Sequence, residues 1–361
     1  MREYRNCHIA KWLLVVIFLT TTLILPACAC PATPPIATTI PPTTTIPLTT
    51  TLAPVIFPDA NLETVIREAI NKPGDPIYTS DFLSLIKLEA GVIGISDLTG
   101  LEYCLNLEEL YLYANNINDI SVLAGLSNLE VLNLYTNNIS DISALAGLSG
   151  LEVLNLYTNN ISDISALAGL SNLGTLYLAG NNISDLSPLT GLTNLQELSL
   201  STNNISDISP LAGLSNLQVL YLHTNNISDI SALAGLSNLE KLYLESNNIS
   251  DISALAGLSN LERLYLESNN ISDISALADL SDLQRVNLEN NDISDISPLA
   301  DLGNLETLWL AGNNISDISA LIEYTGLSIG DIVYFDDNPL SEESINVFIS
   351  QLVTRGVIVS Y

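Results

Sequence analysis

Aromatic, basic and acidic side chains in this 361-residue chain recur at intervals of 22 residues. The basic residues between positions 88 and 326 are Lys241, Arg263 and Arg285, and a glutamate follows each of them four positions later. Tyrosine stands between the two charges in two of these three segments. Tyr and Trp give a large contact area at a small entropic cost, so rows of such residues suit recognition of another molecule.

The same residues offer little for catalysis. His223 is the sole histidine after position 8, and no Ser-His-Asp, Cys-His or metal-ligand spacing accompanies it. The acidic residues form one row rather than the facing pair that glycoside hydrolysis needs. We therefore expect no enzyme activity, no catalytic residues, no cofactor and no metal.

The spacing reflects an internal repeat that extends from about position 85 to about position 326. The blocks 129–150 and 151–172 differ only in their last residue, Gly150 against Asn172. A fixed period of this length predicts an array of stacked units in which each unit contacts only its neighbours.

Each unit has the same apolar pattern. With Leu129 as position 1, positions 1, 4, 6, 11, 14, 17 and 20 are nearly always Leu or Ile. Alternation over positions 4–6 predicts a short strand, and spacing by three over positions 11–20 predicts an irregular or 3₁₀-like return. Position 9 should face inward, because an amide both donates to and accepts from backbone groups of the turn. It is Asn at 115, 137, 159, 181, 203, 225, 247, 269, 291 and 313.

The pattern L-x-x-L-x-L-x-x-N-x-I-x-x-I-x-x-L-x-x-L-x-x resembles the leucine-rich repeat, and the I-S-D-I-S-x-L return resembles its bacterial internalin-like class. The resemblance covers about two-thirds of the chain. It implies an α/β solenoid: a curved, right-handed array with a concave parallel β-sheet, a 3₁₀ or coil convex side, and helical caps at both ends. It also implies a role in protein recognition and adhesion at a cell surface.

Two residues of the return are alternatives for capping its turn. Ser at position 15, followed by Pro in Ser187-Pro188, looks like an N-cap and the first residue of a helical turn. Asp at position 13, as in Asp141, is the other candidate. We expect structural capping rather than calcium binding, because one carboxylate per repeat is few for a cation that takes six to eight oxygens.

Positions 3, 5 and 7 point away from the core side of the strand and should line the concave surface. The alternative is that the tyrosines only pack across neighbouring strands. The ligand-binding residues that we predict there are Tyr111, Tyr113, Tyr135, Tyr157, Tyr177, Tyr221, His223, Lys241, Tyr243, Glu245, Arg263, Tyr265, Glu267, Arg285, Glu289 and Trp309.

The first 55 residues read as a leader and a spacer. Residues 1–27 have a basic start and a short apolar run, as in a signal peptide, and Leu25-Pro26-Ala27-Cys28 resembles the lipoprotein box that would lipidate Cys28. Plain signal-peptidase cleavage and cleavage before Cys30 are the alternatives. Residues 28–55 are a Thr/Pro-rich linker whose composition favours extended, solvated chain.

Caps should flank the repeats at 85–326. The N-terminal cap, 56–84, begins a helix after Asp59 and a second short one near Thr79 or Ser80. The C-terminal cap, 327–361, should hold a helix capped by Ser341 and ended by Gly356, then a strand over 357–359. Asn338 takes position 9 there after a slip of three residues.

Composition limits the partners. The chain has 40 acidic and 10 basic residues, a net charge of −30, which repels nucleic-acid phosphates and anionic lipids. Four cysteines form no disulfide framework, and Cys104 reads as a small buried apolar residue. We expect a monomeric, non-enzymatic protein outside the cell, attached to a membrane only through a lipid on Cys28 and secreted without it. Its expected partner is a protein; a carbohydrate or cell-wall ligand and a passive surface scaffold are the alternatives.

Overall fold

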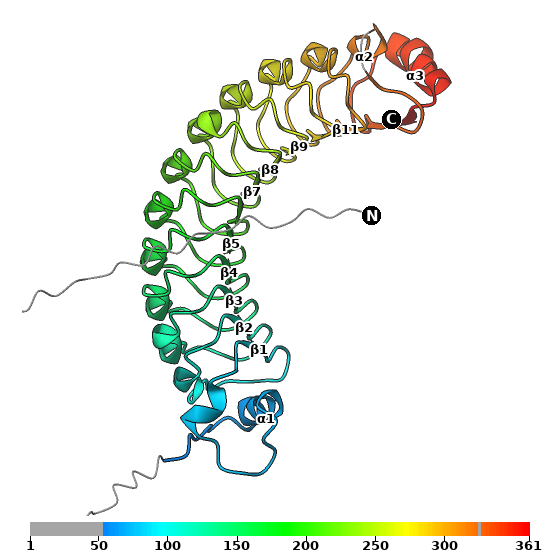
Figure 1. The fold of residues 1–361 in the computed structure, drawn as a ribbon. Coiled ribbons are helices and arrows are strands. Elements are labelled where there is room, and N and C mark those ends of the chain that lie inside the picture. The colour runs from blue at the N-terminus through cyan, green and yellow to red at the C-terminus, as the bar shows by residue number, and fades with distance from the viewer. Residues whose placement is uncertain (1–52, 324–325) are drawn as a thin grey trace, which may run out of the picture. The chain divides into compact units, whose positions relative to one another are not determined.

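A computed structural model describes residues 53–323 and 326–361. The described chain forms an arc of stacked turns with strands along the inner side and short helices along the outer side (Figure 1). Its strands are β1 (Lys87–Glu89), β2 (Glu109–Tyr111), β3 (Val131–Asn133), β4 (Val153–Asn155), β5 (Thr175–Tyr177), β6 (Glu197–Ser199), β7 (Val219–Tyr221), β8 (Lys241–Tyr243), β9 (Arg263–Tyr265), β10 (Arg285–Asn287), β11 (Thr307–Trp309), β12 (Ile332–Tyr334) and β13 (Ile358–Ser360).

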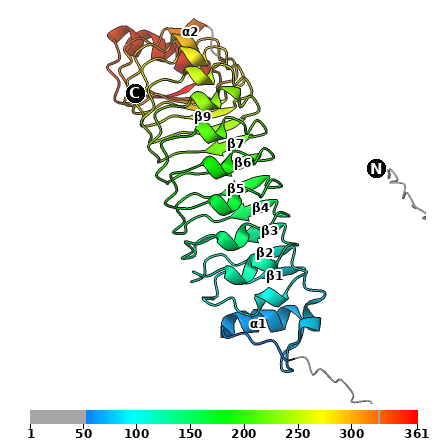
Figure 2. The same cartoon turned by 90° about the vertical axis from the view of Figure 1, so that its left-hand side faces the viewer.

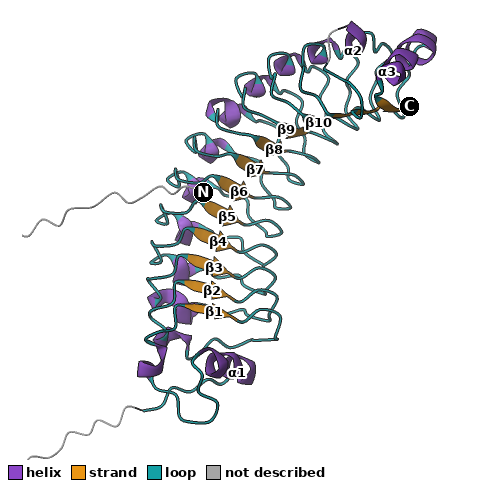
Figure 3. Ribbon diagram, turned by 45° about the vertical axis from the view of Figure 1, so that its right-hand side comes forward, coloured by secondary structure: helices purple, strands orange, loops and turns teal. Residues whose placement is uncertain are grey.

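All of these strands pair in parallel, in chain order, as one sheet (Figure 3). Val131 pairs with Val153 and Val153 pairs with Thr175, so each residue meets the residue one repeat later. The strands cover positions 3–5, one residue earlier than predicted. The reason is that both Glu130 and Val131 donate to the carbonyl of Glu108, so pairing begins before the leucines alternate.

The leucines and isoleucines of the pattern fill the inside of every turn, as predicted; Leu132, Leu134 and Ile139 have no exposed area. Position 9 lies among them. The Asn203 amide nitrogen donates to the carbonyls of Leu178 and Leu200 at 3.1 and 3.0 Å, which confirms the inward orientation. Asn338 makes the equivalent bonds to Leu310 and Phe335, which confirms the slip of three residues.

The residue before each inward asparagine is the point where the chain leaves the sheet. Its φ is positive, 54° at Thr202 and 57° at Thr224. This left-handed conformation is unfavourable for residues with a side chain, less so for Asn and Asp than for the others, and glycine adopts it freely. Gly180, Asn290 and Gly312 occupy the same position in other turns. The turn is therefore built at a conformational cost that stacking must offset.

Single turns of 3₁₀ helix form the convex side and stack in a column (Figure 2). Asp251 accepts the N–H of Ser253 at 2.8 Å, and the same bond recurs in successive turns. The Asp side chain at position 13 therefore caps the first N–H of the turn, from the residue before the N-cap, Ile252. The expectation of Ser at position 15 as the N-cap is wrong, since Ser253 is the first residue of the turn and its own N–H is the donor. The turns are Ser121–Gly125, Ser143–Leu145, Ser165–Leu167, Ser187–Leu189, Ser209–Leu211, Ser231–Gly235, Ser253–Leu255, Ser275–Leu277 and Ser297–Leu299, preceded by Leu101–Tyr103.

The N-terminal helix α1 (Ala60–Ala69) begins where predicted. Asp59 caps it by accepting the N–H groups of Asn61 and Leu62. The second predicted helix is only a 3₁₀ turn, Thr79–Phe82, because the chain must reach β1 five residues later. Cys104, at the start of the array, is fully buried, and burial raises the pKa of its thiol to about 12. It is an apolar core residue, as predicted.

The C-terminal end contains α2 (Ala320–Glu323), a π-helical turn (Ser344–Phe348) and α3 (Ile349–Arg355). The Ser341 hydroxyl accepts the N–H of Ser344 at 3.1 Å, so it caps the helical segment as predicted. Gly356 ends α3 with φ 91°, in the left-handed region. The last strand, β13, begins one residue later than expected because the N–H of Val357 still bonds back to the helix at Leu352.

Candidate ligand-binding face

The inner side of the arc presents a continuous stack of aromatic rings. Tyr221 and Tyr243 have ring centroids 4.6 Å apart with 13° between planes, and Tyr243 and Tyr265 lie 5.0 Å apart at 19°. Strands β7, β8 and β9 hold these rings at position 5, one above the next. We call Tyr221, Tyr243, Tyr265, Trp309 and Tyr334 the aromatic stack.

The aromatic stack continues across a strand that has no aromatic residue. Tyr265 and Trp309 stand on β9 and β11, which lie about 9.6 Å apart, yet their ring centroids are 5.9 Å apart. The two rings therefore lean toward each other over Asn287 of β10, which is buried. The Asn287 amide donates to the Glu267 carboxylate at 3.1 Å and accepts the N–H of Glu289 at 3.0 Å. Trp309 then stacks on Tyr334 at 6.2 Å and 3°.

A second tyrosine row lies toward the N-terminal end, at position 7. Tyr113 and Tyr135 are stacked at 5.2 Å with nearly parallel planes, and Tyr157 is 47% exposed. Where this row ends and position 5 becomes aromatic, the surface is hollowed by about 300 Å³. We call this site the tyrosine hollow; its lining residues are Tyr135, Asn155, Tyr157, Tyr177 and Ser199.

The predicted basic residues all lie on this face. They occupy position 3 of the repeat, which is the first residue of β8, β9 and β10. The described ion pairs include none with Lys241 or Arg263, whereas Arg285 approaches Glu306 at 3.7 Å. Lys87 occupies the same position in β1 and was not predicted. It bonds Glu89 and Glu109 at 3.0 and 3.1 Å and lies over the Tyr111 ring at 4.9 Å.

Glu245, Glu267 and Glu289 form the acidic row, at position 7 after β8, β9 and β10. Burial, together with the like charge of Glu267, raises the pKa of Glu245 to about 7. Burial and the same neighbour also raise the pKa of Glu289. His223 precedes them one strand earlier, and burial lowers the pKa of its imidazole. At neutral pH this part of the face therefore holds a neutral histidine beside a carboxyl group that is readily protonated.

Ser201, His223 and Glu245 occupy position 7 of three adjacent turns, so a serine, a histidine and an acid follow one another along the concave side. A serine nucleophile needs a hydrogen bond to its base, and the base needs one to an acid. Neither Ser201 Oγ nor His223 Nδ1 has a hydrogen-bond partner, and both atoms are buried. The three side chains therefore do not form the connected relay of a hydrolase.

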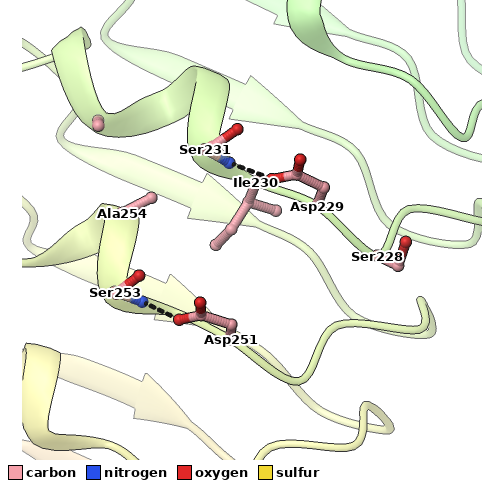
Figure 4. A pocket seen from close by; sticks show the side chains of 8 residues that line it. Ser228, Asp229, Ile230, Ser231, Asp251, Ser253 and Ala254 are labelled. Carbon is pink, nitrogen blue, oxygen red and sulfur yellow. Dashed lines mark hydrogen bonds between the residues drawn. The ribbon is translucent and has the colours of Figure 1, made fainter.

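The convex side has a hollow of about 520 Å³ between two neighbouring turns (Figure 4). Asp229 and Asp251 line it, and each directs an oxygen at a serine N–H of its own turn. Within the described residues no group of three or more His, Cys, Asp or Glu side chains is arranged to hold a metal ion. These carboxylates cap turns, which is the role predicted for the Asp of the return.

The sixteen predicted residues all lie on or beside the strands of the concave side, but they form separate groups. Tyr113, Tyr135 and Tyr157 belong to the second row, Tyr111 is tied to Glu109 by a 3.0 Å hydrogen bond, and the others surround β5–β11. Asn155, Ser199, Ser201 and Asn287 lie at positions 5 and 7, which were predicted to line the concave surface, although they are not among the sixteen. Lys87 and Tyr334 were not predicted on this face. Lys87 lies at position 3 of the first strand, and the slip of three residues displaces Tyr334 from its column.

Comparison with known proteins agrees with this geometry. A family model described as leucine-rich repeats, in two-copy units, matches residues 105–147, 127–169, 149–191, 171–213, 193–235, 237–279 and 281–323. No curated protein matches the chain significantly. Within the described residues, no helix is both long and apolar enough to cross a membrane.

Two solved internalins of Listeria monocytogenes are similar to this chain. InlF is 34% identical over 85% of this chain and 97% of its own, with a TM-score of 0.70. Internalin C2 is 41% identical over 60% of this chain and 95% of its own, with a TM-score of 0.56.

A more distant structure shares the fold alone. It is the ectodomain of the Arabidopsis thaliana receptor kinase GASSHO1/SCHENGEN3, solved in complex with CASPARIAN STRIP INTEGRITY FACTOR 2, and it is 21% identical over 76% of this chain and 34% of its own, with a TM-score of 0.62. The repeat pattern, the inward asparagines and the matches to family and structures lead to one conclusion: the chain belongs to the leucine-rich-repeat family, in its bacterial internalin-like class.

Proposed function

We propose that this protein binds a protein ligand on the concave face and has no enzymatic role. The observation that carries the proposal is the aromatic stack, which runs from β7 to β12 with charged residues on both sides. Aromatic rings and arginine dominate the energetics of protein interfaces. The rings are already fixed by stacking, so a ligand that covers them loses little side-chain entropy on their account.

The test compares variants of the full-length chain. The change of Tyr243, Tyr265 and Arg263 to Ala should abolish binding to a partner obtained by screening the wild-type chain against a library of purified cell-surface proteins. A matched control changes Ser215, Ser237 and Ser259 to Ala, because these side chains are exposed and lie at position 21, outside the strands. Equal binding by the aromatic variant and the control would refute the concave site.

The tyrosine hollow supports a second candidate function, binding of a carbohydrate or cell-wall glycan. Three tyrosine side chains surround Asn155 and Ser199 there, which combines ring faces with polar hydrogen-bonding groups. A glycan array probed with the full chain tests this candidate. Binding that soluble sugar competes, and that Tyr157→Ala abolishes, would replace the protein-ligand proposal. Failure of both screens would favour a passive surface scaffold.

We infer from the sequence alone that the array is displayed outside the cell. The leader, Cys28 and all but the last three residues of the Thr/Pro-rich linker lie outside the described residues. Their sequences suit export, lipid attachment and spacing from a membrane. Wild-type protein expressed in a bacterium that processes lipoproteins should partition with membranes. Cys28→Ser should shift it to the soluble fraction, and continued membrane partitioning of this variant would contradict lipidation.

A further inference from the structure

Four polar side-chain atoms in the described part of the chain are buried without a hydrogen-bond partner, and all lie on the concave side. They are Ser201 Oγ, His223 Nδ1, Glu245 Oε2 and Arg263 Nε. Ser201, His223 and Glu245 follow β6, β7 and β8, and Arg263 lies in β9. Four consecutive turns thus contribute one atom each. Native structures contain few such atoms, and each of them destabilises the fold, so their clustering needs an explanation.

The four unpaired atoms belong to side chains of different chemistry: a hydroxyl, an imidazole, a carboxylate and a guanidinium group. Ser201 is only 2% exposed and belongs to the same position of the repeat as His223 and Glu245. Arg263 carries the opposite charge on the other side of the Tyr243 and Tyr265 rings. The described ion pairs include none that joins Glu245 or Glu267 to Lys241 or Arg263. The distance explains this, because positions 3 and 7 of one repeat are separated by four residues of extended chain, about 13 Å.

We propose that a segment of the protein ligand lies across β7–β9, with a basic side chain against Glu245 and Glu267 and an acidic side chain against Arg263 and Lys241. This inference rests on the protein-binding function proposed above. The part of the segment between the two charges covers Tyr243 and Tyr265.

The chemistry favours a peptide segment over other ligands. The free Glu245 oxygen needs a donor, and a partner arginine supplies a planar group that bonds a carboxylate and also stacks on tyrosine. The 13 Å between positions 3 and 7 equals four residues of extended chain, so side chains of opposite charge about four residues apart reach both sides. Nucleic acids and neutral glycans have no cation for the acidic row.

The unpaired atoms also predict that a residue that strengthens ligand binding lowers the stability of the free protein. Before the ligand arrives, the Glu245 carboxyl group is half-buried and one of its oxygens, Oε2, has no hydrogen-bond partner, which destabilises the fold. The ligand later supplies the missing bond. Glu245→Gln should therefore leave the free protein as stable as the wild type or more so, while it weakens binding. If Glu245 had only a structural role, its loss would lower stability.

The experiment uses a phage-displayed library of random twelve-residue peptides selected on the immobilised full-length chain. Enriched peptides should carry Arg or Lys and Asp or Glu about four residues apart. Synthetic versions should bind, by calorimetry, about tenfold or more weakly to Glu245→Gln and to Arg263→Gln. Glu130→Gln, an exposed position outside the face, is the matched control and should bind as the wild type does.

Three outcomes would overturn the inference: no enriched peptide, enriched peptides without this charge pattern, or unchanged affinity in Glu245→Gln and Arg263→Gln. The proposed function is tested separately by Tyr243→Ala. Lost binding in Tyr243→Ala beside intact binding in the charge variants would refute the charged contacts and leave the concave site standing. Intact binding in all variants would refute the concave site itself.

Discussion

Asn203 accepts, at its side-chain oxygen, the backbone N–H of Ile183, which lies one turn earlier in the array, at 2.9 Å. Its amide nitrogen donates to carbonyls of its own turn and of the preceding turn. One side chain thus satisfies buried backbone groups in two turns, in a region where the strands have ended.

Asn203→Ala should therefore destabilise the fold by about 1–3 kcal/mol, since it leaves a buried N–H and buried carbonyls without partners. Urea unfolding followed by circular dichroism measures the change. Asn204→Ala is the control, because Asn204 is the next residue and its side chain is exposed. Equal midpoints for the two variants would contradict the role given to the inward asparagines.

Thr202 adopts φ 54°, which costs a β-branched residue more than it costs asparagine. Thr202→Asn should raise stability by about 0.5–1 kcal/mol, because Asn290 has the same conformation at the same position of another turn. Thr202→Val should not, since valine is also β-branched. Thermal unfolding of both variants provides the measurement, and a lower Tm for Thr202→Asn would argue against strain at this position.

Asp251 is a cap whose effect should depend on pH. The N–H of Ser253 bonds the carboxylate, which lowers the pKa of Asp251 in the folded chain. Its contribution to stability should be present above the unfolded pKa of about 3.9 and should disappear as the pH falls through the lower folded pKa. Asp251→Ala should thus lower the Tm at pH 7 and converge with the wild type in strong acid.

Adding calcium distinguishes two roles of the convex aspartates, capping of turns and binding of a metal ion. Millimolar calcium should leave the Tm of the wild-type chain unchanged at constant ionic strength, because the aspartates at position 13, such as Asp229 and Asp251, already accept a backbone N–H. An increase in Tm with calcium that Asp229→Asn and Asp251→Asn remove would show that this surface binds cations instead.

Glu245 should make stability depend on pH in the opposite sense. Its folded pKa is about 7, above the unfolded value of about 4.3. The folded chain therefore holds a proton that the unfolded chain releases, and this residue's contribution falls as the pH rises from about 4 to about 7. Above pH 7 the buried carboxylate is charged, beside His223 and Glu267.

Glu245→Gln removes this dependence. The variant should match the wild type near pH 4 and should be more stable by about 1–3 kcal/mol at pH 8, which is the usual cost of an unsatisfied buried group. Unfolding midpoints at several pH values measure the difference between the two proteins. Glu130→Gln, at an exposed position, should show no such difference. A constant offset across the pH range would mean that burial does not perturb Glu245.

The repeat alone was sufficient to predict the stacking and the side each residue faces. Because Leu132 and Asn137 recur with one period, a single turn predicts the arrangement of the other regular turns. Asn338 breaks the period by three residues, and its place was predicted from the Asp-Asn-Pro that contains it. Choosing the cap between Asp141 and Ser143 needed the backbone, since both residue types cap turns and only the geometry places the serine N–H against the aspartate.

For the candidate site, the sequence was sufficient to predict which residues face the concave side, but not how their side chains contact one another. Sequence position placed Tyr265 and Trp309 on the same side, but the approach of their rings over Asn287 depends on how both side chains lean. Similarly, the isolation of Ser201 Oγ depends on which neighbouring side chains reach it, and a repeat pattern does not contain that information.

The identical register of blocks 129–150 and 151–172 has an evolutionary consequence. Val131 meets Val153 just as Val153 meets Thr175, so the surface that one block offers to the next is nearly constant. A recombination event that adds or deletes one block leaves both ends of the array and every remaining contact intact. The length of the concave side can therefore change within a lineage in single genetic steps. Each step gives a sequence that still folds, so the surface can come to fit a longer or shorter ligand without passing through an unfolded protein.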